Sequence, residues 1–294
     1  MRAVAVAAPV LERLVDRSLQ PWSVVGTGAS AAYLARDGFV IAVIPPGVPM
    51  MPNGIALDRV PPRWPAVGKR VRCTPGLLDF GGDRVCWSAA DPPAWDPGPA
   101  VANGRPPDAA ALLARGRAVL RSCGVQPTAD VTALADALAA NGLRVAGDHH
   151  GRLGVRELLA AVRDRDPLAA RAAVDALLGN GPGLTPEGDD LLCGAAATVA
   201  RFGPAAGFQE ARLQWWLAAI CPPDARRRSS DLSATLLELA AAGRVAEPAG
   251  SVLDLTDHGW QSSLRRLVGV GSSTGRAYAL AIGSAALLLG SPAG

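Results

Sequence analysis

Residues 109–124 read AAALLARGRAVLRSCG, and at this stretch the chain changes from a strand pattern to a helical one. Its apolar residues recur every three or four positions, and it ends in Gly124, the residue type that most often caps a helix. The same pattern continues in VTALADALAANG (131–142), VRELLAAVRDRD (155–166), PLAARAAVDALLGNG (167–181), DDLLCGAAATVARFG (189–203) and DLSATLLELAAAG (231–243). We therefore predict an all-helical domain over residues 107–294.

The sequence before residue 107 has a different pattern. Short runs rich in Val and Ile alternate with Gly and Pro, which indicates strands separated by turns: SVVGTG (23–28), GFVIAVIPPG (38–47), GIALDRV (54–60), VGKRVRC (67–73), GLLDF (76–80) and DRVCWSA (83–89). Residues 91–108 hold six prolines and two glycines, which is typical of a linker. The predicted fold class is α+β, with a β-rich domain over residues 1–106 followed by the helical domain.

Composition excludes several classes of protein. The chain has 294 residues, of which 49% are hydrophobic and 19% charged, so a disordered chain is excluded. A net charge of +3, with the basic residues mostly dispersed, argues against a dedicated nucleic-acid binder. Lys69 is the only lysine and lies in no suitable motif, which argues against Schiff-base chemistry and a Walker-type phosphate site.

Cysteine usage and the two ends of the chain predict a cytoplasmic protein. The five cysteines are widely spaced, without a CxxC pair, so we expect thiols in a reducing compartment. Charged residues such as Glu12 and Arg13 interrupt the apolar N-terminus early, which is not typical of a signal peptide. The apolar run Ala277–Gly290 is shorter than a membrane span and predicts a helix buried on most faces. We expect no membrane association.

The strongest functional signal is GNGPGLTPEGDDLLCGAAATVARFG, residues 179–203. Thr185 is the expected helix N-cap and Pro186 the expected first helical residue. Glycines before a helix let backbone N–H groups converge, and the helix dipole adds positive potential. This combination predicts that a small anionic substrate, through a phosphate or carboxylate, binds at Gly181, Gly183, Leu184 and Thr185.

Two adjacent acids, Asp189 and Asp190, follow in the first turn of the expected helix. They could stabilise the helix dipole, position an amine nucleophile, or coordinate Mg²⁺ beside a phosphate, so they are the candidate catalytic and metal-binding residues. Gly188 weakens the turn that it occupies, which suggests a close approach of the backbone to another group.

Two further polar segments precede helical patterns: RRRSSDLSATLLELAAAG (226–243) and GVGSSTGRAYALAIG (269–283). The first offers Ser230 and Ser233 as neutral donors, although Ser229 or Ser230 could equally be an ordinary N-cap. The second places Ser273 and Thr274 between glycines and is a second candidate anion site. Arg228 or Arg276 could neutralise the bound anion through a bidentate contact.

The pattern GxGPGLTPxGDDLLxG, found here at residues 179–194, resembles the central motif of a bacterial family that includes the oxamate carbamoyltransferase subunit of allantoin breakdown. The resemblance implies a carbamoyltransferase-type subunit that uses carbamoyl phosphate and a small nitrogenous carboxylate and works with partner subunits. One departure concerns the late turn, where Arg276 follows Ser273-Thr274-Gly275 in place of an acidic residue.

Two alternatives stay open on the sequence alone. The chain could be a non-catalytic subunit that binds a small anion or acts as a scaffold for a catalytic partner. Residues 179–194 could also be no more than a well-capped helix start, with the site in the proline-rich segment or between the two domains. Turnover by the purified chain alone would distinguish an enzyme from a scaffold.

Overall fold

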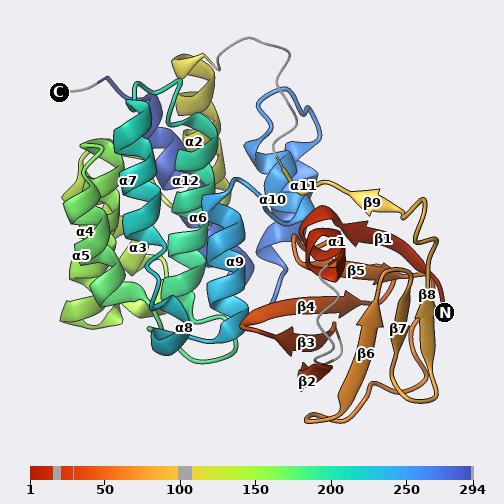
Figure 1. Cartoon of the computed structure of the whole chain (residues 1–294). Helices are drawn as coiled ribbons and strands as arrows, with labels where there is room; N and C mark the ends of the chain where they lie inside the picture. The colour runs from red at the N-terminus through yellow and green to blue at the C-terminus, as the bar shows by residue number, and fades with distance from the viewer. Residues whose placement is uncertain (16–20, 29, 99–107, 293–294) are drawn as a thin grey trace. The chain divides into compact units, whose positions relative to one another are not determined.

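The computed structural model describes residues 1–15, 21–28, 30–98 and 108–292 and confirms the α+β class, with strands first and helices after them (Figure 1). The chain divides into two compact units: Met1–Pro97 with Val245–Glu247, and Gly98–Arg244 with Pro248–Gly294. The predicted boundary at residue 106 and half of the predicted linker lie outside the described residues.

The N-terminal unit is built on a nine-stranded sheet with the order β8-β7-β6-β2-β3-β4-β5-β1-β9. Each of the six predicted strand segments overlaps one of its strands. Most neighbours are antiparallel, whereas β4–β5 and β1–β9 are parallel. The elements are β1 (Ala3–Ala7), α1 (Ala8–Val15), β2 (Trp22–Thr27), β3 (Ala32–Arg36), β4 (Phe39–Ile44), β5 (Gly54–Leu57), β6 (Arg70–Thr74), β7 (Leu77–Asp79), β8 (Arg84–Cys86) and β9 (Ala94–Trp95).

Strand β4 forms the centre of the hydrophobic core in this unit. All six of its residues, FVIAVI, are buried. A continuous apolar run is typical of a strand that is covered on both faces, whereas a half-exposed strand alternates apolar and polar residues. Val10 and Leu14 of α1 belong to the same core cluster, so the apolar side of this helix is buried with the sheet.

The sheet curls until its two ends meet. Arg2, just before β1, forms a bridge with Cys86 of β8, the strand at the opposite end of the sheet order. The Cys86 N–H also donates to the Met1 carbonyl over 3.1 Å. The right-handed twist of strands favours such curling, and the contact covers an edge that would otherwise be open to aggregation.

The second unit is helical, and each of the six predicted helical segments overlaps one of its helices. Four of the first helices begin at an aspartate whose side chain accepts a backbone N–H, which satisfies an otherwise unpaired donor: Asp108, Asp130, Asp148 and Asp166. The elements are α2 (Ala109–Ser122), α3 (Val131–Ala140), η1 (Arg144–Gly147), α4 (His149–Arg163), α5 (Pro167–Leu177), α6 (Glu187–Phe202), α7 (Glu210–Ile220), α8 (Ala225–Arg228), α9 (Asp231–Ala241), α10 (Glu247–Leu253), α11 (Trp260–Val268) and α12 (Thr274–Gly290).

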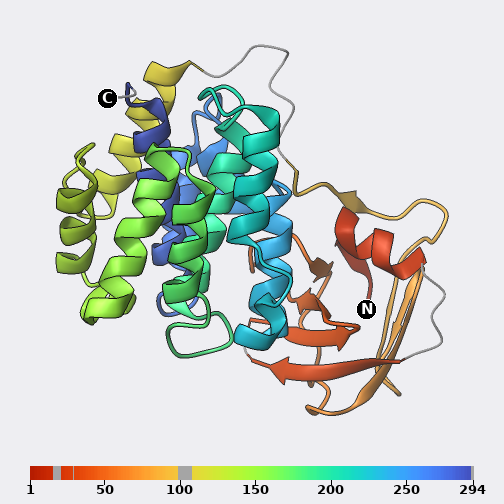
Figure 2. The same cartoon turned by 60° about the vertical axis from the view of Figure 1, so that its left-hand side comes forward.

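Helix α12 runs through the middle of the helical unit, beside α2 and α6 (Figures 1 and 2). Most of its residues are buried, as predicted from its small and apolar composition. Close packing against α2 depends on Gly116, because a Cβ atom there would lie 2.4 Å from the Leu287 nitrogen. In the part of the chain that the structure describes, none of the helices has the length and apolar character that a membrane crossing requires.

Candidate functional site

The predicted anion-binding loop connects α5 to α6, but α6 begins one residue later than predicted. Glu187 is its first residue, and Pro186 is the N-cap, with an extended backbone (ψ 144°) and no side-chain cap. The expectation that Thr185 caps the helix and Pro186 opens it is therefore wrong. The Thr185 hydroxyl instead forms a hydrogen bond with the Thr274 hydroxyl over 2.9 Å, so it is unavailable as a cap.

Gly188 does mark a close approach, as predicted, but the neighbouring group belongs to the protein itself. A Cβ atom at this position would lie 2.0 Å from the Leu177 carbonyl oxygen. The Gly188 N–H donates to the Asn180 carbonyl over 3.0 Å. This glycine therefore lets α6 pack against the end of α5, and it gives no evidence for a ligand.

The loop before α6 presents backbone donors to solvent. Gly181 and Gly183 have φ values of +125° and +101°, a region that side chains rarely allow. Within the described residues, we find no acceptor for four of the N–H groups in this loop. They belong to the residues that the sequence predicted as anion ligands: Gly181, Gly183, Leu184 and Thr185. The first three residues are exposed and Thr185 is half-buried.

Asp189 is 1% exposed, and both of its carboxyl oxygens accept hydrogen bonds. Oδ1 accepts from the Gly179 N–H over 2.6 Å, and Oδ2 accepts from the Ser229 hydroxyl. Burial raises the pKa of Asp189, although these bonds to Gly179 and Ser229 act in the opposite direction. Asp189 thus joins the loop, α6 and the start of α9. The sequence indicated Ser229 only as a possible cap, because no local pattern links it to an acid 40 residues away.

Asp190 is 3% exposed and differs from its neighbour in having an oxygen without a partner. Its Oδ2 contacts no hydrogen-bond donor among the described residues, whereas the carboxyl is hydrogen-bonded to Thr274. Burial, with smaller contributions from the charges of Asp189 and Glu187, raises the pKa of Asp190 to about 8. The carboxyl is therefore mostly protonated at neutral pH.

Glu187 is a third buried acid in the same turn, and it was not among the predicted site residues. It is 5% exposed, and its Oε2 accepts from the Val145 N–H over 2.6 Å. Three acids in the first turn of α6 suit the positive end of the helix dipole. The acidic first turn was visible in the sequence, but the contact with Val145 in η1 was not.

Ser230 and Ser233 meet the loop through one carbonyl group. Ser230 is the N-cap of α9, as one of the two interpretations predicted, and accepts from the Ser233 N–H over 3.0 Å. Its hydroxyl donates to the Leu184 carbonyl over 2.5 Å, and the Ser233 hydroxyl donates to the same oxygen over 3.4 Å. Both serines therefore hold the loop in place.

The second candidate anion site adjoins the first. Ser273 is the N-cap of α12 without a side-chain cap, and Thr274 is the first residue of that helix. Because the Thr274 hydroxyl contacts Thr185, the GSSTG turn and the loop before α6 meet at this pair. The structure thus brings the two predicted segments into one site.

The two candidate arginines have partners inside the protein. The Arg228 guanidinium donates to Asp175 Oδ1 over 3.1 Å and to the Val174 carbonyl over 3.0 Å. The Arg276 guanidinium donates to the carbonyls of Cys123 and Asn141, at 3.1 and 2.9 Å. Each guanidinium has five N–H donors, so these bonds orient the two side chains within the protein and leave further donors on each.

The acids do not fit a resident Mg²⁺ centre. The portion of the chain described by the structure holds no group of three or more His, Cys, Asp or Glu side chains arranged around a metal. Both oxygens of Asp189 are already engaged, which leaves only Asp190 as a ligand. Mg²⁺ needs octahedral oxygen coordination, so one protein carboxylate is a poor basis for a site.

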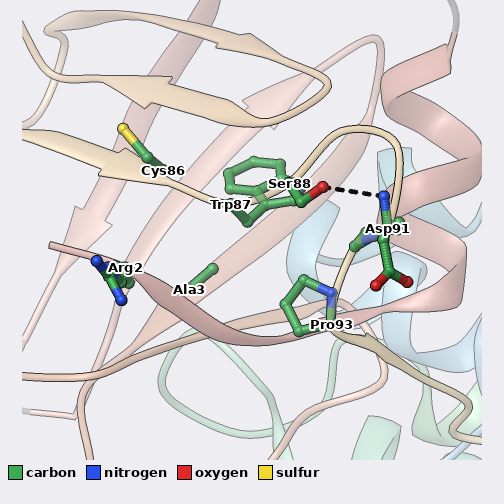
Figure 3. A pocket seen from close by; sticks show the side chains of 8 residues that line it. Arg2, Ala3, Cys86, Trp87, Ser88, Asp91 and Pro93 are labelled. Atoms are coloured by element: carbon green, nitrogen blue, oxygen red, sulfur yellow. Dashed lines mark hydrogen bonds between the residues drawn. The ribbon is translucent and has the colours of Figure 1, made fainter.

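A pocket of about 610 Å³ lies in the N-terminal unit, where β8 meets the start of β1 (Figure 3). Arg2 and Asp91 lie on opposite sides of it in this view, and the Asp91 N–H donates to the Ser88 hydroxyl over 3.0 Å. None of the predicted site residues lines it. It does include the start of the proline-rich segment, one alternative location for the site: Arg2, Ala3, Cys86, Trp87, Ser88, Asp91, Pro92 and Pro93.

Comparison with known proteins supports the helical site. The family model described as oxamate carbamoyltransferase subunit AllH matches residues 177–286, a range that contains every predicted site residue. No curated protein and no solved structure matches the chain. The matched family is the one that the GLTPEGDD motif resembles, and the match covers residues 177–286.

Proposed function

We propose that this chain is a subunit of a carbamoyltransferase-type enzyme that acts on carbamoyl phosphate and a small nitrogenous carboxylate such as oxamate, together with partner subunits. The family match over residues 177–286 supports the reaction class and the need for partners. The observation that carries the proposal is Asp190, a buried carboxyl with one unpartnered oxygen, hydrogen-bonded to the threonine that contacts the donor-rich loop. An acid with a strongly shifted pKa beside an anion-binding loop is a common feature of active sites.

In this proposal the loop N–H groups bind the anion. Converging backbone donors stabilise a phosphate or carboxylate without a lysine, which agrees with the single lysine of this chain. Arg228 stays with Asp175 and contributes to the fold around the loop. Asp189, predicted as catalytic, is assigned here a positioning role, since its two oxygens fix Gly179 and Ser229.

The proposed reaction moves one proton. When the amide nitrogen of oxamate attacks the carbonyl carbon of carbamoyl phosphate, a C–N bond forms, the C–O bond to phosphate breaks, and the nitrogen loses a proton. In the reverse reaction phosphate attacks the carbamoyl carbon, and the departing nitrogen needs a proton. Asp190, with its pKa raised to about 8, suits both directions near neutral pH. Positioning and charge stabilisation supply the rest of the catalysis.

The test combines ligand binding with turnover. The purified chain is titrated with carbamoyl phosphate, oxamate and inorganic phosphate, and its thermal stability is measured. A ligand at 100 times its Kd adds roughly 2.7 kcal/mol to the apparent stability. We expect stabilisation by carbamoyl phosphate and oxamate in the wild type, and no turnover by Asp190→Asn. Undiminished turnover by this variant would contradict the catalytic role of Asp190.

The second candidate function is a non-catalytic anion-binding subunit that supports a catalytic partner. The near-complete burial of Asp190 favours it, because an acid that solvent cannot reach is also shielded from substrate. In that case Asp190→Asn would leave both ligand binding by the chain and the turnover of the assembled complex unchanged. Comparing the chain alone with the complex therefore separates the two functions.

A further inference from the structure

The Leu184 carbonyl of the loop is held by the hydroxyl of Ser230, the N-cap of α9. The hydroxyl donates to this oxygen over 2.5 Å, and the direction of the bond is certain because a carbonyl can only accept. The same hydroxyl accepts the Ser233 N–H over 3.0 Å. The Ser233 hydroxyl lies 3.4 Å from the Leu184 oxygen, longer than the roughly 2.5–3.0 Å of a normal hydroxyl bond. Ser230 is therefore the main partner of this carbonyl, and its single proton is used there.

The bond from Ser230 sets the direction of the next backbone donor. The described residues contain no cis peptide bond, and in a trans peptide unit the C=O and the N–H point in opposite directions. Because the Leu184 carbonyl points to Ser230, the Thr185 N–H points away from it. This N–H is one of the loop donors for which the described residues offer no acceptor. A side chain 46 residues beyond Leu184 thus directs an unpaired donor.

The other end of the loop follows the same rule. The Gly188 N–H donates to the Asn180 carbonyl over 3.0 Å, so the Gly181 N–H, in the same peptide unit as that carbonyl, points away from the start of α6. This donor also has no acceptor within the described part of the chain. The two carbonyls differ in what holds them, because a backbone N–H holds that of Asn180 and a side chain holds that of Leu184. A substitution can therefore release the second peptide unit and leave the first in place.

We propose that Ser230 is a positioning residue, which turns the Thr185 N–H toward the phosphate or carboxylate bound by the loop and does not itself contact this anion. The inference rests on the proposed function, and it gives a different role to a residue that the sequence predicted as a direct ligand. A donor that is already oriented binds an anion more tightly, because its ordering costs no further free energy on binding. When the Ser230 bond is lost, the affinity falls with the fraction of time for which the N–H is correctly directed.

Two substitutions at Ser230 separate the helix cap from the bond to the loop. Glycine is also a favourable N-cap, so Ser230→Gly removes the donor to Leu184 at little cost to α9, whereas Ser230→Thr keeps the hydroxyl. Isothermal titration of the full chain with inorganic phosphate and with carbamoyl phosphate gives the two Kd values. Ser230→Gly should raise both about tenfold, the usual effect of one hydrogen bond to a charged group, with the Tm within a few degrees of wild type. In Ser230→Thr both should stay within about threefold of wild type.

The backbone amide resonance of Thr185 provides a readout that a merely structural role would not move. In nuclear magnetic resonance spectra of the full chain, it should shift during a phosphate titration in wild type and in Ser230→Thr, and it should shift much less in Ser230→Gly at equal saturation. Asp130→Gly is the matched control, because it replaces the N-cap of α3, which accepts the Ala133 N–H, and leaves the loop unchanged. Its Kd values should equal those of wild type within about twofold.

Two results would overturn this inference alone: an unchanged Kd in Ser230→Gly, or a Thr185 amide that does not respond in wild type although phosphate binds. The second result is obtained with wild-type protein, so it decides the question even where Ser230→Gly folds poorly. Wild-type protein that binds neither phosphate nor carbamoyl phosphate would contradict the proposed function, and this inference with it.

Discussion

The pocket of the N-terminal unit and the loop site of the helical unit offer contrasting kinds of candidate site. The pocket is a hollow of about 610 Å³, and its charged residues Arg2 and Asp91 are exposed to solvent. The loop site has Asp189 and Asp190 at 1% and 3% exposure, next to a loop in which Gly181, Gly183 and Leu184 are exposed. The pocket is distinguished by its shape, whereas the loop site is distinguished by two buried carboxyl groups with raised pKa values.

The difference shows why shape alone is a weak guide to function. Exposed charges on a pocket rim keep their water and cost the fold little, so their presence needs no functional reason. A buried carboxyl with an unpartnered oxygen destabilises the fold, and such groups are concentrated at active sites. Oppositely charged residues also give the pocket no preference for an anion, whereas backbone donors before a helix favour one, as we propose for the loop.

The largest expected effect is a loss of stability when the close packing of Gly188 at the loop site is disturbed. Gly188→Ala should lower the free energy of unfolding by roughly 3 kcal/mol or more, because the new Cβ would lie 2.0 Å from the Leu177 carbonyl oxygen. Gly183→Ala is the matched control, since its Cβ would meet no atom within 4 Å and costs only the strain of its positive φ, about 1–2 kcal/mol. Urea denaturation measures both. Equal losses would mean that packing at Gly188 is looser than described.

The second effect is a difference in turnover between a variant of the loop site and a variant of the pocket. Asp190→Asn should reduce turnover by about 100-fold or more, the usual contribution of a general acid or base, with the Tm within a few degrees of wild type. Arg2→Ala, in the pocket, should leave turnover within about twofold. Steady-state assays of carbamoyl phosphate formation or consumption measure both. The opposite result, with Arg2→Ala inactive and Asp190→Asn active, would move the site to the pocket.

The third effect is a pH dependence of stability. The folded pKa of Asp190 is about 8, against an ordinary value of 3.8, so the folded state binds more protons than the unfolded state between these values. The contribution of Asp190 to the free energy of unfolding is therefore fully present below about pH 4. It is lost as the pH rises toward 8, by on the order of 1 kcal/mol per pH unit.

Asp190→Asn removes this dependence, so the variant should gain stability relative to wild type as the pH rises from 5 to 8. Urea denaturation at a series of pH values measures the difference between the two proteins. Comparison with the wild type cancels the contribution of Asp189, whose pKa is raised in the same direction. Parallel pH profiles would show that Asp190 is ionised throughout.

The smallest effect is expected in the pocket. Ser88→Ala removes the acceptor of the Asp91 N–H, but this bond is exposed and water can replace it. We expect a change in stability within about 0.5 kcal/mol and unaltered binding of carbamoyl phosphate and oxamate. Chemical denaturation and calorimetry measure the two quantities. Loss of ligand binding in this variant would show that the pocket contributes to the site.

Local sequence patterns predicted the elements and part of the site. The alternation of Val and Ile runs with glycines and prolines predicted β2 and β4 to β8, and the three- and four-residue spacing of apolar residues predicted α2 to α6 and α9, since both depend on neighbouring residues. The same patterns did not predict β1, β3, β9, α1, α7, α8, α10 or α11. The Ser230 cap follows from the same local rules. The start of α6 was misplaced by one residue because Thr185 has a distant partner that no local rule includes.

By itself, the sequence thus determined the α+β order of elements, the GLTPEGDD motif with its resemblance to a known family, and the residue types of the candidate site. The tertiary structure alone decided that Thr185 meets Thr274 across 89 residues, that Ser229 meets Asp189 across 40, and that Gly188 packs on Leu177. It also decided that Val245–Glu247 return to the N-terminal unit and that Asp190 is buried enough to have its pKa raised. The physical reason is that secondary structure follows from short-range periodicity, whereas side-chain partners, burial and proton affinity depend on which distant segments the packing brings together.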